Sequence, residues 1–182
     1  YSPLVAMSDG TPVHVECREE DNFVLKAECL EKVITPKTKA IILTYPNNPT
    51  GAIMTKEELQ EIANVLIRHD LLVITDEIYA ELTYGRKHQS IATLPGMKER
   101  TVYISGFSKA FAMTGWRLGY VCAPPEIDEA MFKIHQYGIM CAPIMSQYAA
   151  IEALKDGLSD NFATVEEMRD SYDKRRKFVL HS

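Results

Sequence analysis

Short apolar runs rich in β-forming residues alternate with helical patterns along this chain, and that alternation constrains the fold more than any other feature. The runs predict strands at Pro12–Glu16, Ala40–Thr44, Leu71–Thr75, Thr101–Ser105 and Leu118–Ala123. Two of them are apolar almost without a break, which is typical of strands buried on both faces of a parallel sheet. The sequence therefore predicts an α/β fold, a three-layer sandwich in which helices cover a mostly parallel sheet.

Helical patterns fill the spaces between the predicted strands. The clearest one follows Thr55, because Thr55-Lys-Glu-Glu58 reads as a capping box, in which the side chains of the two end residues bond to backbone amides. Apolar residues then recur at helical spacing as far as His69. Weaker patterns predict helices over residues 26–34, 126–137 and 145–155, and a long polar helix from residue 161 to the end.

Length and charge are those of an ordinary globular domain. The chain of 182 residues can bury a core without disulfides or metal ions. Its net charge is −5 and its basic residues are scattered, apart from residues 174–177 on one helix, so nothing suggests nucleic-acid binding. The four cysteines are far apart, and neither a signal peptide nor a long apolar run is present. We therefore expect a cytoplasmic protein without a membrane segment.

Three segments carry side chains suited to one chemistry, and each follows a predicted strand. Residues 47–51 read Asn-Asn-Pro-Thr-Gly, residues 76–79 read Asp-Glu-Ile-Tyr, and residues 105–120 read Ser-Gly-Phe-Ser-Lys-Ala-Phe-Ala-Met-Thr-Gly-Trp-Arg-Leu-Gly-Tyr. In α/β sheets, ligands collect at the carboxyl ends of the strands, so these segments should meet there. A lysine amine can condense with an aldehyde, a carboxylate can hold a ring nitrogen protonated, and an arginine can grip phosphate.

Motifs for other chemistries are missing. The sequence has no GxGxxG after a strand and no P-loop. The spacing from Ser105 to Lys109 is one residue too long for the SxxK pair of penicillin-recognising enzymes. The histidines show no HExxH and no paired spacing, so we expect no metal site.

Together the three segments resemble the pyridoxal-phosphate core of class I/II aminotransferases, the aspartate aminotransferase-like enzymes of fold type I. The resemblance implies that Lys109 links covalently to pyridoxal 5′-phosphate and moves a proton, and that Asp76 keeps the ring nitrogen protonated. It assigns Tyr79 as a donor to the phenolate oxygen of the cofactor. Asn48 matches the asparagine that donates to the same oxygen and orients the substrate carboxylate. The turn also makes Asn48–Pro49 a candidate for a cis peptide bond.

The phosphate contacts follow from the same resemblance. Gly115-Trp-Arg-Leu-Gly119 matches the family's arginine motif, so Arg117 is expected to bind the cofactor phosphate. Many relatives carry a phosphate-binding serine three residues before the lysine, whereas Gly106 stands there in this chain. Ser105 and Ser108 are the expected substitutes, and the backbone of Gly106 is the alternative.

The resemblance spans nearly the whole chain but only the middle of a family member. It implies that residues 1–160 are part of the large cofactor-binding domain, and that residues 161–182 lead towards a C-terminal small domain outside this chain. The glycine-rich phosphate turn, the aromatic that stacks on the ring and the arginine for the substrate carboxylate are expected outside it too. The fragment alone is therefore expected to be inactive. Family members are commonly homodimers that share active sites across the interface.

The activity implied for the parent protein is the transfer of an amino group between an L-amino acid and a 2-oxo acid. Aspartate, alanine and aromatic amino acids all stay open as donors. Two other functions stay open as well. A β-eliminating lyase on the same scaffold would release pyruvate and ammonia without an acceptor, and an aminotransferase-like sensor domain of a transcription regulator would need a basic DNA-binding segment before Tyr1.

Overall fold

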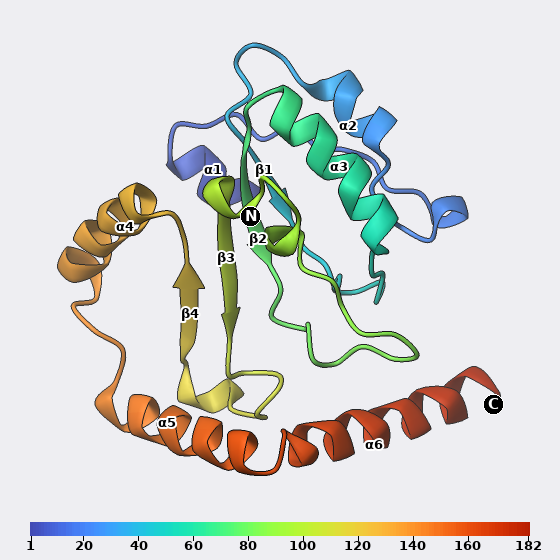
Figure 1. Cartoon of the computed structure of the whole chain (residues 1–182), viewed down its shortest axis with the longest axis vertical. Coiled ribbons are helices and arrows are strands. Elements are labelled where there is room, and N and C mark those ends of the chain that lie inside the picture. Colours follow the sequence, from blue (N-terminus) through green and yellow to red (C-terminus); the bar gives the residue numbers. More distant parts are fainter.

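A four-stranded sheet forms the centre of the computed structural model, which describes all 182 residues (Figure 1). Its strands lie in the order β1 (Ala40–Leu43), β2 (Leu72–Asp76), β3 (Thr101–Gly106) and β4 (Gly119–Cys122). The first three run parallel, and β4 pairs antiparallel with β3 at the edge. The prediction of an α/β fold with a mostly parallel sheet is confirmed.

Helices lie around this sheet, and all five predicted helices are present. The helices are α1 (Ser2–Met7), α2 (Ala27–Val33), α3 (Lys56–Arg68), α4 (Pro125–Gly138), α5 (Ile144–Ser159) and α6 (Ala163–Leu180), with 3₁₀ turns at Glu19–Asp21, Ile91–Thr93, Lys98–Arg100 and Thr114–Trp116. In Figure 1, α2 and α3 lie to one side of the sheet and α4 lies beside β4, while α5 and α6 run along the end towards which β3 points. None of the helices has the length and apolar character needed to cross a membrane.

Helix α3 contributes the largest apolar face of the core. Its capping box is present as predicted, because Thr55 Oγ1 accepts from the Glu58 amide at 3.1 Å and Glu58 Oε2 accepts from the Thr55 amide at 2.8 Å. Behind the cap, one side of the helix packs against strand residues of the main core cluster, and the buried helix residues are Leu59, Ile62, Ala63, Val65 and Leu66. Burying each large side chain contributes about 1.5 to 3 kcal/mol, so this contact fixes α3 to the sheet.

One predicted strand is wrong. Residues 12–16 form no ladder with any strand and run as a mostly exposed segment without regular secondary structure. A β-rich composition makes a strand only where a neighbouring edge takes up the backbone hydrogen bonds, and Pro12 has no N–H to offer one. The segment instead lays Val15 and Cys17 against the core. Helix α1, just before it, was not among the expected elements.

The capping box provides a direct test of this part of the fold. Replacing Thr55 by Ala removes the oxygen that accepts from the Glu58 amide, so we expect the free energy of unfolding to fall by about 1 kcal/mol. Urea denaturation measures the change. Thr164→Ala is the control, because Thr164 is exposed and its side chain makes no hydrogen bond. Equal losses in the two variants would contradict a specific role for the cap.

Candidate functional site

The three segments singled out in the sequence meet at the carboxyl ends of the parallel strands. The turn with Asn48 follows β1, Asp76 is the last residue of β2, and the segment with Lys109 follows β3. The register pairs Asp76 with Ile104, so β2 and β3 end at nearly the same level. Parallel strands that end together bring residues far apart in sequence to one edge of the sheet.

Side chains from all three segments contact one another at this edge. Asn48 Nδ2 donates to the hydroxyl oxygen of Tyr79 at 3.3 Å, and Lys109 Nζ lies 5.3 Å from the centroid of the Tyr79 ring. An ammonium over an aromatic face is attracted by the ring's quadrupole. Tyr79 therefore stands between the amide and the amine, and because its oxygen accepts from Asn48, its own hydrogen is left to donate to a ligand.

The turn that presents Asn48 is held in shape by its neighbour Asn47. The Asn47 Nδ2 atom donates to the Thr44 carbonyl at 3.2 Å and to Thr44 Oγ1 at 3.1 Å. Its Oδ1 atom accepts from Thr50 Oγ1 at 2.9 Å. The Asn48–Pro49 bond is cis, as predicted, and Tyr45–Pro46 is cis as well. Asn47 thus builds the turn, and its bonds leave Asn48 to face Tyr79.

Asp76 has both carboxylate oxygens engaged. Its Oδ1 atom accepts from the Ile78 amide at 3.1 Å, and its Oδ2 atom accepts from the hydroxyl of Tyr1. Burial, reinforced by the hydrogen bond to Asp76 and by its charge, raises the pKa of Tyr1 well above the ordinary value. Tyr1 therefore stays protonated at neutral pH and remains a donor. Sequence reasoning missed this contact, because nothing in the pattern links residues 75 positions apart.

Arg117 and Ser108 belong to one hydrogen-bonded loop. Arg117 is exposed and has left-handed backbone geometry, and its Nη1 atom donates to the Thr114 carbonyl at 2.9 Å. The Thr114 hydroxyl donates in turn to the Ser108 carbonyl at 2.8 Å. The loop therefore fixes Arg117 relative to the residue just before Lys109, although neither Arg117 nor Ser108 bonds directly to Asn48 or Tyr79.

Position 106 lies on the same face of the sheet as Asp76. Ile104 pairs with Asp76, and position 106 follows Ile104 by two residues in β3, where side chains alternate between the two faces. Gly106 itself lies opposite Gly119 of β4. A Cβ atom on Gly106 would lie 2.8 Å from the Gly119 Cα atom and 2.9 Å from the Leu118 carbonyl oxygen. Side chains do not approach backbone so closely, so a serine at this position would require the backbone of β4 to shift.

Ser105 faces the other side of the sheet, where it lines a cavity of about 1170 Å³ with Tyr103 and Glu77. Residues of α6 also line this cavity, and neither Asn48 nor Lys109 is among its lining residues. Burial raises the pKa of Tyr103 to about 12. Ile78, Ala80 and Ala110 also line the cavity, so it reaches the segments that carry Tyr79 and Lys109 although neither of those side chains lines it. No group of three or more potential metal ligands occurs in the chain.

The chain is similar to known proteins over its whole length. The family model described as aminotransferase class I and II matches residues 1–182. YugH of Bacillus subtilis, named as an aminotransferase, is 54% identical over 182 residues, which are 100% of this chain and 46% of YugH. The aspartate aminotransferase of Pyrococcus abyssi is 50% identical over 180 residues, 98% of this chain and 46% of that protein. The aromatic aminotransferase structure from Pyrococcus horikoshii superposes with a TM-score of 0.94 at 50% identity, over 100% of this chain and 48% of the other. The chain thus spans about half the length of these relatives.

The close contact at Gly106 leads to a prediction about stability. Gly106→Ser should force β3 and β4 apart and lower the free energy of unfolding by about 1 to 3 kcal/mol. Gly138→Ala is the control, because no atom lies within 4 Å of the Cβ that it would add. Denaturant unfolding of both variants measures the difference, and a fully stable Gly106→Ser protein would refute the steric explanation.

Proposed function

We propose that this chain, which belongs to the class I and II aminotransferases, is the cofactor-binding part of an enzyme that transfers an amino group between an L-amino acid and a 2-oxo acid. The observation that carries the proposal is the contact of Asn48, Tyr79 and Lys109, which come from three separate segments. The aminotransferase names of the relatives support it over a β-eliminating lyase or a sensor domain.

The side chains at this edge fit pyridoxal 5′-phosphate, because they match its functional groups one by one. An amine suits the aldehyde, a carboxylate suits the ring nitrogen, a phenol suits the phenolate oxygen and a guanidinium suits the phosphate. When bound, the cofactor draws electrons from the substrate Cα atom, so that its proton becomes acidic.

Lys109 would hold the cofactor through its Nζ atom and, once released, would take and return the proton at the substrate Cα atom. An amine does this only when part of its population is uncharged. The segment that carries Lys109 is anchored by three neighbours with buried side chains, Phe107, Ala110 and Met113.

Asp76 would keep the ring nitrogen protonated, and the two hydrogen bonds from Tyr1 and Ile78 hold its carboxylate in a fixed orientation. Tyr79 would donate to the phenolate oxygen, since its own oxygen already accepts from Asn48. Asn48 would also orient the substrate carboxylate.

Arg117 would bind the phosphate, because its Nη1 bond to Thr114 leaves other guanidinium nitrogens to donate. Ser108, in the same loop, is the better placed of the two candidate serines, since Ser105 lies on the face opposite to Asp76. The Gly106 amide is the remaining candidate donor.

The names of the relatives point to two classes of donor amino acid and do not decide between them. An aspartate aminotransferase and an aromatic aminotransferase match this chain at the same identity of 50%. We propose aspartate and aromatic amino acids as the donors to test first.

Because the chain spans about half of its relatives, we propose that residues 1–160 are part of the large domain, that residues 161–182 lead towards a small domain, and that the fragment alone is inactive.

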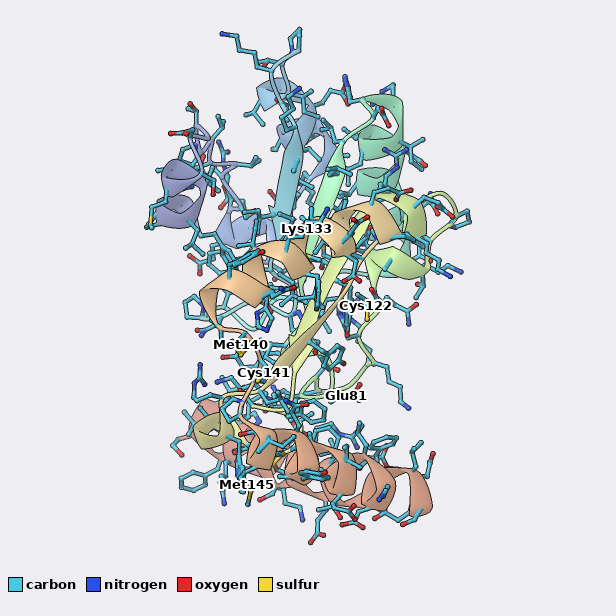
Figure 2. The ribbon with its side chains drawn as sticks, turned by 90° about the vertical axis from the view of Figure 1, so that its left-hand side faces the viewer. Glu81, Cys122, Lys133, Met140, Cys141 and Met145 are labelled. Carbon is cyan, nitrogen blue, oxygen red and sulfur yellow. The ribbon has the colours of Figure 1, made fainter.

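We propose a cytoplasmic homodimer as the working form. Four free cysteines suit a reducing compartment. Exposed apolar side chains gather where α4 passes into α5, as Figure 2 shows for Met140, Cys141 and Met145. The exposed members include Phe132, Ile134, Tyr137, Ile139, Ile144 and Tyr148. A surface of this kind is typical of a protein interface, and a second copy would cover it.

Lys109 offers the most direct test of the proposed chemistry. In the full-length protein, borohydride should fix the cofactor to Lys109, as read by peptide mass, and Lys109→Ala should abolish this labelling and lower turnover at least about 10² to 10⁴-fold. Lys98→Ala, a change at an exposed position, is the control, and Lys109 should be labelled in this variant as in the wild type. Reducible labelling that persists at another lysine would contradict the assignment.

Asp76 should govern chemistry more than cofactor affinity. Asp76→Ala should retain cofactor but turn over roughly a thousandfold more slowly, corresponding to about 4 kcal/mol in the barrier. Cofactor content by absorbance and kcat with saturating substrates separate the two effects. Asp128→Ala, an exposed change in α4, should leave both unchanged. Near-normal kcat in Asp76→Ala would refute its role at the ring nitrogen.

A further inference from the structure

Glu77 is a fully buried carboxylate beside Asp76, and the proposed chemistry gives it no task. Its side chain is 1% exposed. A buried carboxylate is costly unless its oxygens are paired. Here Oε1 accepts from Ser90 Oγ at 2.8 Å and from Thr75 Oγ1 at 3.0 Å, while Oε2 lies 2.5 Å from His88 Nε2. Every oxygen of Glu77 is therefore engaged.

His88 depends on Glu77 in return. Its side chain is 8% exposed, and its Nδ1 atom is buried without a partner, so the contact with Glu77 is its only side-chain hydrogen bond. An ionised carboxylate can only accept, so Nε2 must carry the hydrogen. The pair thus joins two side chains that are almost fully buried, and neither has a second partner of opposite charge.

These hydrogen bonds hold the turn at the end of β2 from the face of the sheet opposite to the Asp76 side chain. Glu77 lies on the same side of the sheet as Thr75, to which it bonds, whereas Asp76 points to the opposite face. The Glu77 amide also donates to the Ile104 carbonyl at 2.9 Å. The backbone that carries Asp76 and Tyr79 is therefore fixed by contacts on the face away from the reactive edge.

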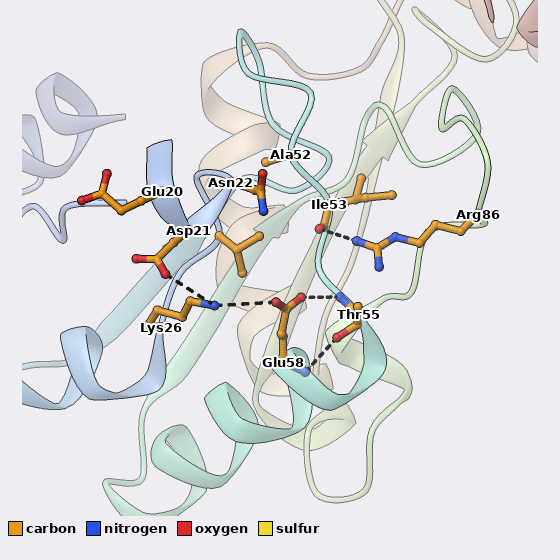
Figure 3. A pocket seen from close by; sticks show the side chains of 10 residues that line it. Glu20, Asp21, Asn22, Lys26, Ala52, Ile53, Thr55, Glu58 and Arg86 are labelled. Atoms are coloured by element: carbon orange, nitrogen blue, oxygen red, sulfur yellow. Dashed lines mark hydrogen bonds and ion pairs between the residues drawn. The ribbon is translucent and has the colours of Figure 1, made fainter. Parts of the chain in front are cut away.

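The segment that supplies His88 also reaches the other turn of the site. Arg86 Nη2 donates to the Ile53 carbonyl at 2.8 Å, just after the turn that carries Asn48, and Figure 3 shows this bond beside the Thr55 cap. Residues 86–90 therefore link the Asn48 turn to the Asp76 turn. A displacement of this segment would alter the contact between Asn48 and Tyr79.

We propose that Glu77, paired with His88, is a positioning residue that sets how Asp76 and Tyr79 meet the cofactor ring. The role rests on the proposed function, because it concerns the same site. A misplacement of about 1 Å behind a reacting group can slow a reaction by about a hundredfold, so the network need not touch the cofactor to matter.

The test uses the full-length protein loaded with pyridoxal phosphate. In Glu77→Gln, kcat should fall about tenfold to a hundredfold. The pH midpoint of the cofactor's visible absorption change should rise, because a displaced Tyr79 hydroxyl donates less well to the phenolate oxygen and leaves the nitrogen joined to Lys109 more basic. In the cofactor-free protein, the amides of Glu77 and Ile78 should exchange with solvent faster.

Two further variants separate positioning from stability. His88→Ala should reproduce the spectral shift, and His88→Gln, which restores a donor to Glu77, should reverse most of it. Ile62→Val is the matched control, because Ile62 is fully buried in α3 and its truncation lowers stability without touching the network. It should lower the unfolding temperature and leave the absorption midpoint unchanged.

The outcomes are distinct. If Glu77→Gln and His88→Ala lower the unfolding temperature but keep the wild-type absorption midpoint and kcat, as Ile62→Val should, the positioning role is refuted and Glu77 is a stabilising residue only. If Glu77→Gln fails to fold, the two His88 variants decide by the same readouts. A wild-type protein with no cofactor-dependent transamination would instead refute the proposed function itself, and this role with it.

Discussion

The parallel hydrogen bonding of β2 between β1 and β3 is the constraint on which the site depends. Because the three strands run the same way, the residues that follow them emerge at one edge. If β2 were reversed, Asp76 would lie at the far end of the sheet from Asn48. The packing of α3 holds the register, since a slip of one residue would turn Val73 from the core to the other face.

Most elements of the fold could be predicted because their signals are local. The Thr55 capping box and the apolar runs of β1 and β2 each lie within a few residues, and the structure has all of them. Residues 12–16 failed as a strand because pairing depends on a neighbour that a sequence pattern does not reveal. Helix α1 is only six residues long, too short for an apolar period to mark it.

The candidate site likewise combines residues that the sequence predicts with contacts that it does not predict. Asn48, Tyr79 and Lys109 were predicted because each lies in a motif, and the motifs follow strands that end at one edge. The contacts that orient these residues were not. Tyr1 bonds to Asp76 across 75 positions, and His88 bonds to Glu77 across 11 positions through a loop without regular structure. No repeating pattern in the sequence marks such pairs, so only the folded structure reveals them.

The most direct test of the central claim is the visible absorption of pyridoxal phosphate in the full-length protein. Addition of an amino acid alone should bleach the band, because the amino group moves onto the cofactor, and addition of a 2-oxo acid should restore it. Each half of the cycle should appear separately, without release of ammonia. A band that does not respond to any amino acid, or the release of pyruvate and ammonia without an acceptor, would contradict the account.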